Sequence, residues 1–172
     1  DAYAIAKIAG IKMCESYNFQ YGMNYKCIMP CNTYGPNDNY NLITSHFYPA
    51  LIMKMLNAKK KNKTSINIWG NGKAKRELLY VDDLADACVY FMNKKSPSLI
   101  NIGTGKDKTI LQYLNFLKKQ INYYPSTKFD LSKPNGTKRK VLDISIAKKL
   151  GWVAKTTLKD GTKKTIKSLT SH

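Results

Sequence analysis

The chain has 172 residues, of which 43% are hydrophobic and 23% are charged. A chain of this length can bury the core of about one domain, and this composition excludes disorder along the whole chain. No apolar run approaches the roughly 18–20 residues that a membrane span requires. We therefore expect a globular protein with no membrane partner.

The formal net charge is +18, because 29 basic residues face 11 acidic ones. Such an excess can indicate nucleic-acid binding. However, the lysines are scattered, and the two short basic runs, residues 59–61 and 138–140, are not interleaved with aromatic side chains. We therefore predict no specific nucleic-acid partner, and we expect the positive surface to attract an anionic substrate by electrostatic steering.

The four cysteines have no spacing typical of metal ligands, and they are Cys14, Cys27, Cys31 and Cys88. Buried free thiols in a reducing compartment are the usual arrangement for such cysteines. We therefore predict no metal site, no disulfide and a cytoplasmic protein.

The first quarter of the chain predicts a helix, a strand, a loop and a second helix. Apolar residues recur at helical spacing from residue 2 to about residue 21. Residues 25–29 read as a short buried strand that Pro30 ends. Gly, Pro, Asn and Asp crowd residues 32–41, which we expect to be a loop. The second helix is expected over residues 46–57.

The remainder alternates short strands with helices. Strands are predicted at residues 66–69, 78–81, 99–102 and 128–130. Helices are predicted at residues 83–94, 109–122 and 144–150, and from about residue 158 onward. We expect Asp82 or Asp83 to cap the helix at 83–94. This order indicates an α/β fold.

Tyr3 and Lys7 stand at positions i and i+4 of the first predicted helix. Their Cβ atoms should therefore lie about 5–6 Å apart on one face. A cation this close stabilises a phenolate and lowers the tyrosine pKa from about 10, which provides a proton donor and acceptor near neutral pH. An ordinary half-buried tyrosine beside a solvated lysine has the same spacing, so the pair alone does not establish catalysis.

Further segments match one family in order and spacing. They are residues 3–12, 29–39, 45–46, 69–72, 76–83, 101–105 and 132–140. With these segments the chain resembles, over nearly its whole length, the GDP-L-fucose synthases, which are NADPH-dependent epimerase-reductases of the extended short-chain dehydrogenase/reductase group. The segments at 76–83 and 101–105 are common to many nucleotide-sugar enzymes, whereas those at 4–12 and 132–140 are more specific.

The resemblance implies the C-terminal part of a Rossmann-type enzyme, mainly its smaller substrate-binding lobe. Residues 1–36 would supply the last catalytic helix and strand of the nucleotide-binding domain, and residues 37–172 mainly the substrate-binding lobe, some of whose segments can return to the sheet. The family's Gly-rich turn for the cofactor pyrophosphate has no counterpart here. We therefore expect the C-terminal half of an enzyme, which is inactive by itself and exposes apolar surface.

The resemblance assigns catalysis to Tyr3, Lys7 and His46. Tyr3 would protonate the C4 oxygen of the substrate, Lys7 would hold the nicotinamide ribose, and His46 would be the acid/base for epimerisation at C3 and C5. No cysteine of this chain is expected to be the second epimerisation group. His46 could instead be only a neighbour of a helix N-cap. The residues expected to contact NADP(H) are Tyr3, Lys7, Pro30, Cys31, Asn32, Thr33 and His46.

Four side chains are expected to bind a GDP-sugar substrate: Lys54, Trp69, Arg76 and Lys140. Diphosphate recognition needs fixed cations, and Arg76 can bind bidentately. Trp69 resembles the family's tryptophan that packs on the sugar nucleotide, although a core aromatic at a strand end gives the same pattern. Lys54 and Lys140 could also be solvated lysines.

The reaction implied by the resemblance is the NADPH-dependent conversion of GDP-4-keto-6-deoxy-D-mannose to GDP-L-fucose. The intact enzyme would be a homodimer built through the helix that bears Tyr3 and Lys7. Two alternatives remain open. One is another nucleotide-sugar epimerase or reductase, and the other is a non-catalytic basic module that binds nucleotide or nucleic acid.

Overall fold

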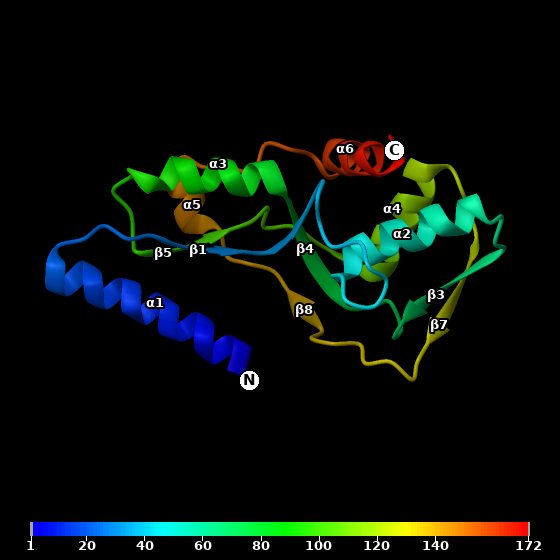
Figure 1. Cartoon of the computed structure of the whole chain (residues 1–172), viewed down its shortest axis with the longest axis horizontal. Coiled ribbons are helices and arrows are strands. Elements are labelled where there is room, and N and C mark those ends of the chain that lie inside the picture. The colour runs from blue at the N-terminus through cyan, green and yellow to red at the C-terminus, as the bar shows by residue number, and fades with distance from the viewer. Residues whose placement is uncertain (1, 172) are drawn as a thin grey trace.

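The computed structural model describes residues 2–171, and it confirms the mixed α/β prediction (Figure 1). In chain order the elements are α1 (Ala2–Tyr21), β1 (Cys27–Pro30), β2 (Asn32–Tyr34), α2 (Phe47–Lys60), β3 (Ser65–Trp69), β4 (Lys75–Tyr80), α3 (Val81–Met92), β5 (Leu99–Ile102), β6 (Asp107–Thr109), α4 (Ile110–Ile121), β7 (Ser126–Asp130), β8 (Arg139–Lys140), α5 (Ser145–Lys149) and α6 (Leu158–Thr170).

The strands form three small sets. β1 pairs in parallel with β5, and β3 pairs in parallel with β7. β4 lies between β2 and β6, with β8 also beside it. Figure 1 shows β1, β5, α3 and α5 at one end and β3, β7, α2 and α4 at the other, with β4 running between them. β4 is therefore the strand that joins the two halves.

Alternate side chains of β4 enter two separate cores, as the two-residue period of a strand requires. Leu78 and Tyr80 belong to the core that α2 and α4 cover. Leu79 belongs to the core between α3 and α5, where Phe91 and Trp152 are its largest members. The residues of β4 are thus fixed from both sides, which makes this strand a rigid support for neighbouring functional groups.

The predicted loop at residues 32–41 is wrong at its start, because Asn32–Tyr34 forms β2. These residues pair in parallel with Leu78–Tyr80 of β4. Local composition favours a loop, but the backbone groups of β2 find their hydrogen-bond partners on a strand distant in sequence. The strand predicted at 78–81 likewise begins earlier, because Lys75–Glu77 pairs with β6.

The predicted cap of the third helix is also wrong. The N-cap of α3 is Tyr80, without a side-chain hydrogen bond, and Asp82 and Asp83 lie in the first turn. The Asp83 carboxylate instead accepts hydrogen bonds from the backbone N–H and the hydroxyl of Thr156, at 2.9 and 3.1 Å. Asp83 therefore holds the segment before α6 against α3.

The helix predicted from residue 2 is confirmed as α1, and none of its described residues is buried. Its exposed apolar side chains include Ile5, Ile8 and Phe19, the last 92% exposed. The expected exposed apolar surface is therefore found along α1. Within residues 2–171, no helix combines the length and the apolar character needed to cross a bilayer.

The cysteines are free thiols, but they are less buried than predicted. Cys14, Cys27 and Cys31 are partly buried, whereas Cys88 is exposed. The prediction of a buried thiol is wrong for Cys88, because this residue is exposed at the edge of the α3 face that buries Ala87 and Phe91.

Candidate active-site cleft

A cleft of about 840 Å³ opens where the start of α1, the β1–β2 segment, the start of α2 and the segment after β8 meet. Seven of the residues predicted from the sequence line it: Tyr3, Pro30, Cys31, Asn32, Thr33, His46 and Lys140. The structure thus brings together residues from four separate parts of the chain. The cleft lies beside the carboxyl end of β1, which is the usual position of ligands in open α/β sheets.

The cleft wall at residues 31–33 is fixed by hydrogen bonds to neighbouring strands. The Cys31 N–H donates to the carbonyl of Ile102, at 3.1 Å, and so extends the β1–β5 ladder. The Asn32 side-chain amide donates to the carbonyl of Glu77 on β4, at 2.9 Å. These contacts hold the wall in place without a ligand.

The Cys31 thiol is held in its neutral form. Burial raises its pKa to about 12, and the negative charge of Glu77 adds to the shift. Because the thiolate is the reactive form of cysteine, a thiol with this pKa is a poor acid/base or nucleophile near neutral pH.

The predicted pair lies on one face of α1. The Lys7 ammonium nitrogen lies 5.5 Å from the centre of the Tyr3 ring. Tyr3 is 73% exposed and lines the cleft, whereas Lys7 is not among the lining residues. Tyr3 therefore borders the cleft, and Lys7 reaches it only through its contact with the Tyr3 ring.

His46 is the N-cap residue of α2, but its side chain makes no capping hydrogen bond. Helix initiation uses its backbone, since the His46 carbonyl accepts from the N–H of Ala50 at 3.1 Å. The imidazole is exposed and lines the cleft. Its side chain is therefore not needed to begin the helix.

Two of the predicted substrate residues lie together outside the cleft. Trp69 is 51% exposed, so it is not a core aromatic. The ammonium nitrogens of Lys54 and Lys133 lie 5.5 and 5.7 Å from the centre of a Trp69 ring. Lys54 also donates to the carbonyl of Asn67, at 3.0 Å, and desolvation lowers its pKa. The result is an exposed aromatic side chain with two cations beside it.

Lys133 is a residue that the sequence argument missed as a candidate. It lies within the matched segment at residues 132–140, which is a signal that could have identified it. Its place beside Trp69 follows from the pairing of β7 with β3, because Trp69 is the register partner of Asp130.

The other two predicted substrate residues are Arg76 on β4 and Lys140 on β8, and they are register partners of each other. One guanidinium nitrogen of Arg76 donates to the carbonyls of Lys75 and Thr137, at 2.7 and 2.6 Å. Desolvation lowers the Arg76 pKa, but an arginine remains charged in proteins. Lys140 lines the cleft, whereas Arg76 and Lys54 do not. The three predicted cations therefore do not share one pocket.

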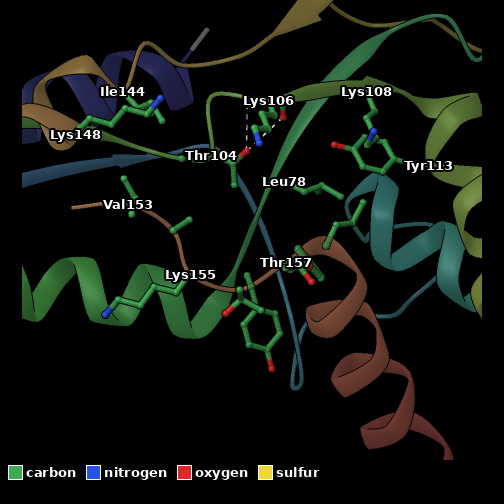
Figure 2. A pocket seen from close by; sticks show the side chains of 16 residues that line it. Leu78, Thr104, Lys106, Lys108, Tyr113, Ile144, Lys148, Val153, Lys155 and Thr157 are labelled. Carbon is green, nitrogen blue, oxygen red and sulfur yellow. Dashed lines mark hydrogen bonds between the residues drawn. The ribbon is translucent and has the colours of Figure 1, made fainter. Parts of the chain in front are cut away.

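A second pocket, of about 450 Å³, lies beside β4 and the start of α6. Figure 2 shows Leu78 and Tyr113 on one side of it, Thr104 on another, and Lys155 extending away. Lys155 forms an ion pair with Asp86 at 3.3 Å. No residue predicted from the sequence as a site residue lines this pocket. The 840 Å³ cleft is the candidate site, because seven of the predicted residues line it.

The parallel β1–β5 pair and a Tyr/Lys helix beside the carboxyl end of β1 define the class of Rossmann-type, extended short-chain dehydrogenase/reductase enzymes. A sequence model of the NAD dependent epimerase/dehydratase family matches residues 1–103, which is more than half of the chain. The chain belongs to this family.

The predicted resemblance to GDP-L-fucose synthases is confirmed. The chain is 43% identical over 171 residues to GDP-L-fucose synthase of Escherichia coli (strain K12), covering 94% of this chain and 53% of that protein. It is 39% identical over 168 residues to GDP-L-colitose synthase of Yersinia pseudotuberculosis, covering 96% of this chain and 54% of that protein.

The fold is similar to a crystal structure of a GDP-L-fucose synthetase from Naegleria fowleri bound to NADP. The TM-score is 0.89 and the sequence identity is 27%, over 99% of this chain and 56% of that chain. The chain spans about half the length of the curated relatives that it matches.

Proposed function

We propose that this chain supplies the C-terminal half of an NADPH-dependent epimerase-reductase that converts GDP-4-keto-6-deoxy-D-mannose to GDP-L-fucose. The observation that carries the proposal is the cleft in which Tyr3, Asn32 and His46 meet, although they are distant in sequence. The resemblance to GDP-L-fucose synthases supports the choice of substrate. Residues 1–36 belong to the nucleotide-binding domain and residues 37–172 mainly to the substrate lobe in this proposal.

The residues present fit the nicotinamide end of NADP(H). The fixed wall at 31–33 presents backbone and side-chain polar groups, Tyr3 lines the cleft, and the Lys7 ammonium lies beside the Tyr3 ring. When bound, the cofactor supplies a hydride to C4 of the sugar. Tyr3 donates a proton to the C4 oxygen, and Lys7 stabilises the phenolate that remains and holds the ribose hydroxyls. Pro30, Cys31, Asn32, Thr33 and His46 complete the cofactor contacts.

Epimerisation uses the acidity that the C4 ketone gives to its neighbouring carbons. His46 exchanges a proton at C3 and C5, since an imidazole gives and takes protons near neutral pH. Tyr3 stabilises the enolate oxygen. Inversion needs a second group on the opposite face, and the neutral, high-pKa Cys31 does not serve as that group.

The substrate diphosphate and nucleotide bind through four side chains in this proposal: Lys54, Trp69, Arg76 and Lys140. Trp69 stacks on the sugar nucleotide, and the cations beside it compensate negative charge. The enzyme is a homodimer whose contact includes α1, because α1 exposes apolar side chains along its length.

The test uses the full-length protein with NADPH and GDP-4-keto-6-deoxy-D-mannose, with product identification by NMR. GDP-L-fucose formation supports the proposal, and Tyr3→Phe should lower kcat by roughly 10²–10⁴-fold. Absence of NADPH oxidation in the wild-type protein would contradict it. The similarity to GDP-L-colitose synthase favours one second candidate, reduction of a different GDP-4-keto sugar, which the same assay with alternative substrates separates.

A further inference from the structure

Glu77 is a fully buried carboxylate that the proposed chemistry does not use. It lies on β4 between Arg76 and Leu78, and its exposed fraction is 0%. Within the described chain, none of the ion pairs includes it. A buried charge without a cation is retained only when hydrogen bonds satisfy its oxygens.

Backbone N–H groups from two separate segments satisfy the Glu77 carboxylate. Its Oε1 atom accepts from the N–H groups of Thr104 and Gly105, at 2.5 and 2.6 Å. Its Oε2 atom accepts from the N–H of Leu142, at 2.8 Å. The fit is close, because a Cβ atom on Gly103 would overlap Oε1. The carboxylate therefore joins the β5–β6 turn to the segment that follows β8.

The segment after β8 forms one wall of the cleft, through Lys140, Val141 and Leu142. Strand pairing with β4 ends at Lys140. Beyond that point, the hydrogen bond from the Leu142 N–H to Glu77 is the next backbone attachment of this wall to β4. The other oxygen of the Glu77 carboxylate bonds to Thr104, which lines the second pocket in Figure 2.

The main chain of the same residue holds the other wall of the cleft. The Glu77 carbonyl accepts from the Asn32 side-chain amide, as described above. Glu77 therefore bonds to two walls of the cleft. Its carbonyl holds the Asn32 wall, and its carboxylate holds the Leu142 wall. A change limited to the side chain acts on the Leu142 wall and leaves the Asn32 contact in place. It also removes the negative charge that helps to raise the Cys31 pKa, although burial, the larger cause of that shift, remains.

We propose that Glu77 is a positioning residue whose carboxylate holds the Lys140–Leu142 wall in the geometry that binds the sugar nucleotide. The inference rests on the proposed function, in which Lys140 contacts the GDP-sugar. Glu77 touches neither substrate nor cofactor in this role. Its effect is on where the Lys140 ammonium stands.

The test is Glu77→Gln in the full-length protein. The amide oxygen can keep the Thr104 and Gly105 bonds, but the amide NH₂ then faces the Leu142 N–H, and two donors cannot bond. We expect hydrogen exchange in the peptide spanning residues 139–144 to accelerate by about ten-fold or more. We also expect the Kd for GDP and the KM for the GDP-sugar to rise about ten-fold, with the KM for NADPH within about two-fold of wild type.

Two control variants separate positioning from loss of charge or stability. Asp82→Asn removes a carboxylate from an exposed site at the start of α3. Ile121→Val weakens the core under α4 away from the cleft. Leu142→Pro removes the same hydrogen bond from its donor side and should reproduce the loss of GDP affinity if Glu77→Gln does not fold.

The proposal is overturned if exchange at residues 139–144 stays at the wild-type rate in Glu77→Gln. It is also overturned if GDP and NADPH affinities fall together, as a general loss of stability in Ile121→Val would produce. A wild-type protein that binds GDP but does not process the GDP-sugar would refute the proposed reaction alone, because the exchange and GDP measurements would still decide the role of Glu77.

Discussion

The Tyr48 hydroxyl and the Thr162 hydroxyl lie 2.6 Å apart, and both side chains are completely buried. Tyr48 belongs to α2 and Thr162 to α6, so this hydrogen bond joins two helices through residues that are 114 positions apart in sequence. Around it, the Tyr48 ring meets the rings of Tyr34 and Tyr113 edge to face. The pair therefore links the last helix to the core that supports β4.

Thr162→Val should lower the free energy of unfolding by about 1–3 kcal/mol, because it leaves the Tyr48 hydroxyl buried without a partner. Valine keeps the shape of threonine, so packing changes little. Thermal or urea unfolding measures the loss. Thr162→Ser, which keeps a hydroxyl, is the matched control and should lose less, and equal losses in the two variants would show that the hydroxyl is not the cause.

The reactivity of the thiols should follow their surroundings. At pH 8, a thiol of pKa about 12 is ionised to only about one part in ten thousand, so Cys31 should not react with Ellman's reagent in the folded protein. Its pKa is raised, so the thiolate appears only as the pH approaches that value. The exposed Cys88 should react readily. Mass spectrometry after brief labelling identifies the modified residue.

The control for thiol labelling is Cys88→Ser, which should remove the fast-reacting thiol. The same protein unfolded in urea should label at Cys31, because burial is the cause of its raised pKa. Rapid labelling of Cys31 in the folded protein at pH 8 would contradict the neutral, partly buried thiol described above.

Nucleotide binding should be visible in tryptophan fluorescence. The chain has two tryptophans, and Trp69 is exposed whereas Trp152 is 3% exposed. GDP stacked on Trp69 should change its emission, and the change should vanish in Trp69→Phe. Trp152→Phe should keep the response, because Trp152 is buried in the other core, where it donates to Asp86.

The same signal separates an enzyme from a general polyanion binder. At about 0.15 M salt, a random oligonucleotide should compete poorly with GDP, because binding to scattered lysines weakens as counterions are added. Stronger competition by the oligonucleotide than by GDP would favour the non-catalytic basic module that the composition left open. Persistence of the GDP response in Trp69→Phe would remove Trp69 from the proposed site.

Elements that depend on local chemistry could be predicted from the sequence. Thr109 begins α4 as expected, because its hydroxyl and the Gln112 side chain form a reciprocal capping box within four residues. β2 and the Asp83–Thr156 contact could not be predicted, because each depends on a partner that only the fold brings near. Propensity describes a residue's own segment and contains no record of such partners.

In the candidate site, too, features that depend on local sequence could be predicted and features that depend on distant partners could not. The side chains at residues 30–33 could be placed at a ligand-binding edge, because they follow a parallel strand. The role of Glu77 could not be predicted from the sequence, because its carboxylate bonds to residues 27 and 65 positions away. The available signal was an acidic residue beside the apolar run Leu78-Leu79-Tyr80, a position at which a charge must have a specific partner.

The last prediction concerns His46, whose imidazole lines the cleft and takes no part in capping α2. If His46 exchanges protons at C3 and C5, the full-length His46→Ala variant in deuterated water should incorporate little deuterium at those carbons. A general acid/base contributes typically about 10²–10⁴-fold, so the loss should be readily measured. Direct reduction at C4 can persist, because Tyr3 remains in place to protonate the C4 oxygen.

Ser45→Ala is the matched control for His46→Ala. The Ser45 hydroxyl is buried beside the helix start and has no hydrogen-bond partner among the described residues, so its removal should leave deuterium exchange near the wild-type rate. NMR or mass spectrometry of the recovered GDP-sugar measures incorporation at each carbon. Wild-type incorporation in His46→Ala would exclude His46 from proton transfer and leave it the backbone role of an N-cap residue. Loss of incorporation in both variants would instead indicate that the start of α2 had been disturbed, because only the imidazole carries the proposed chemistry.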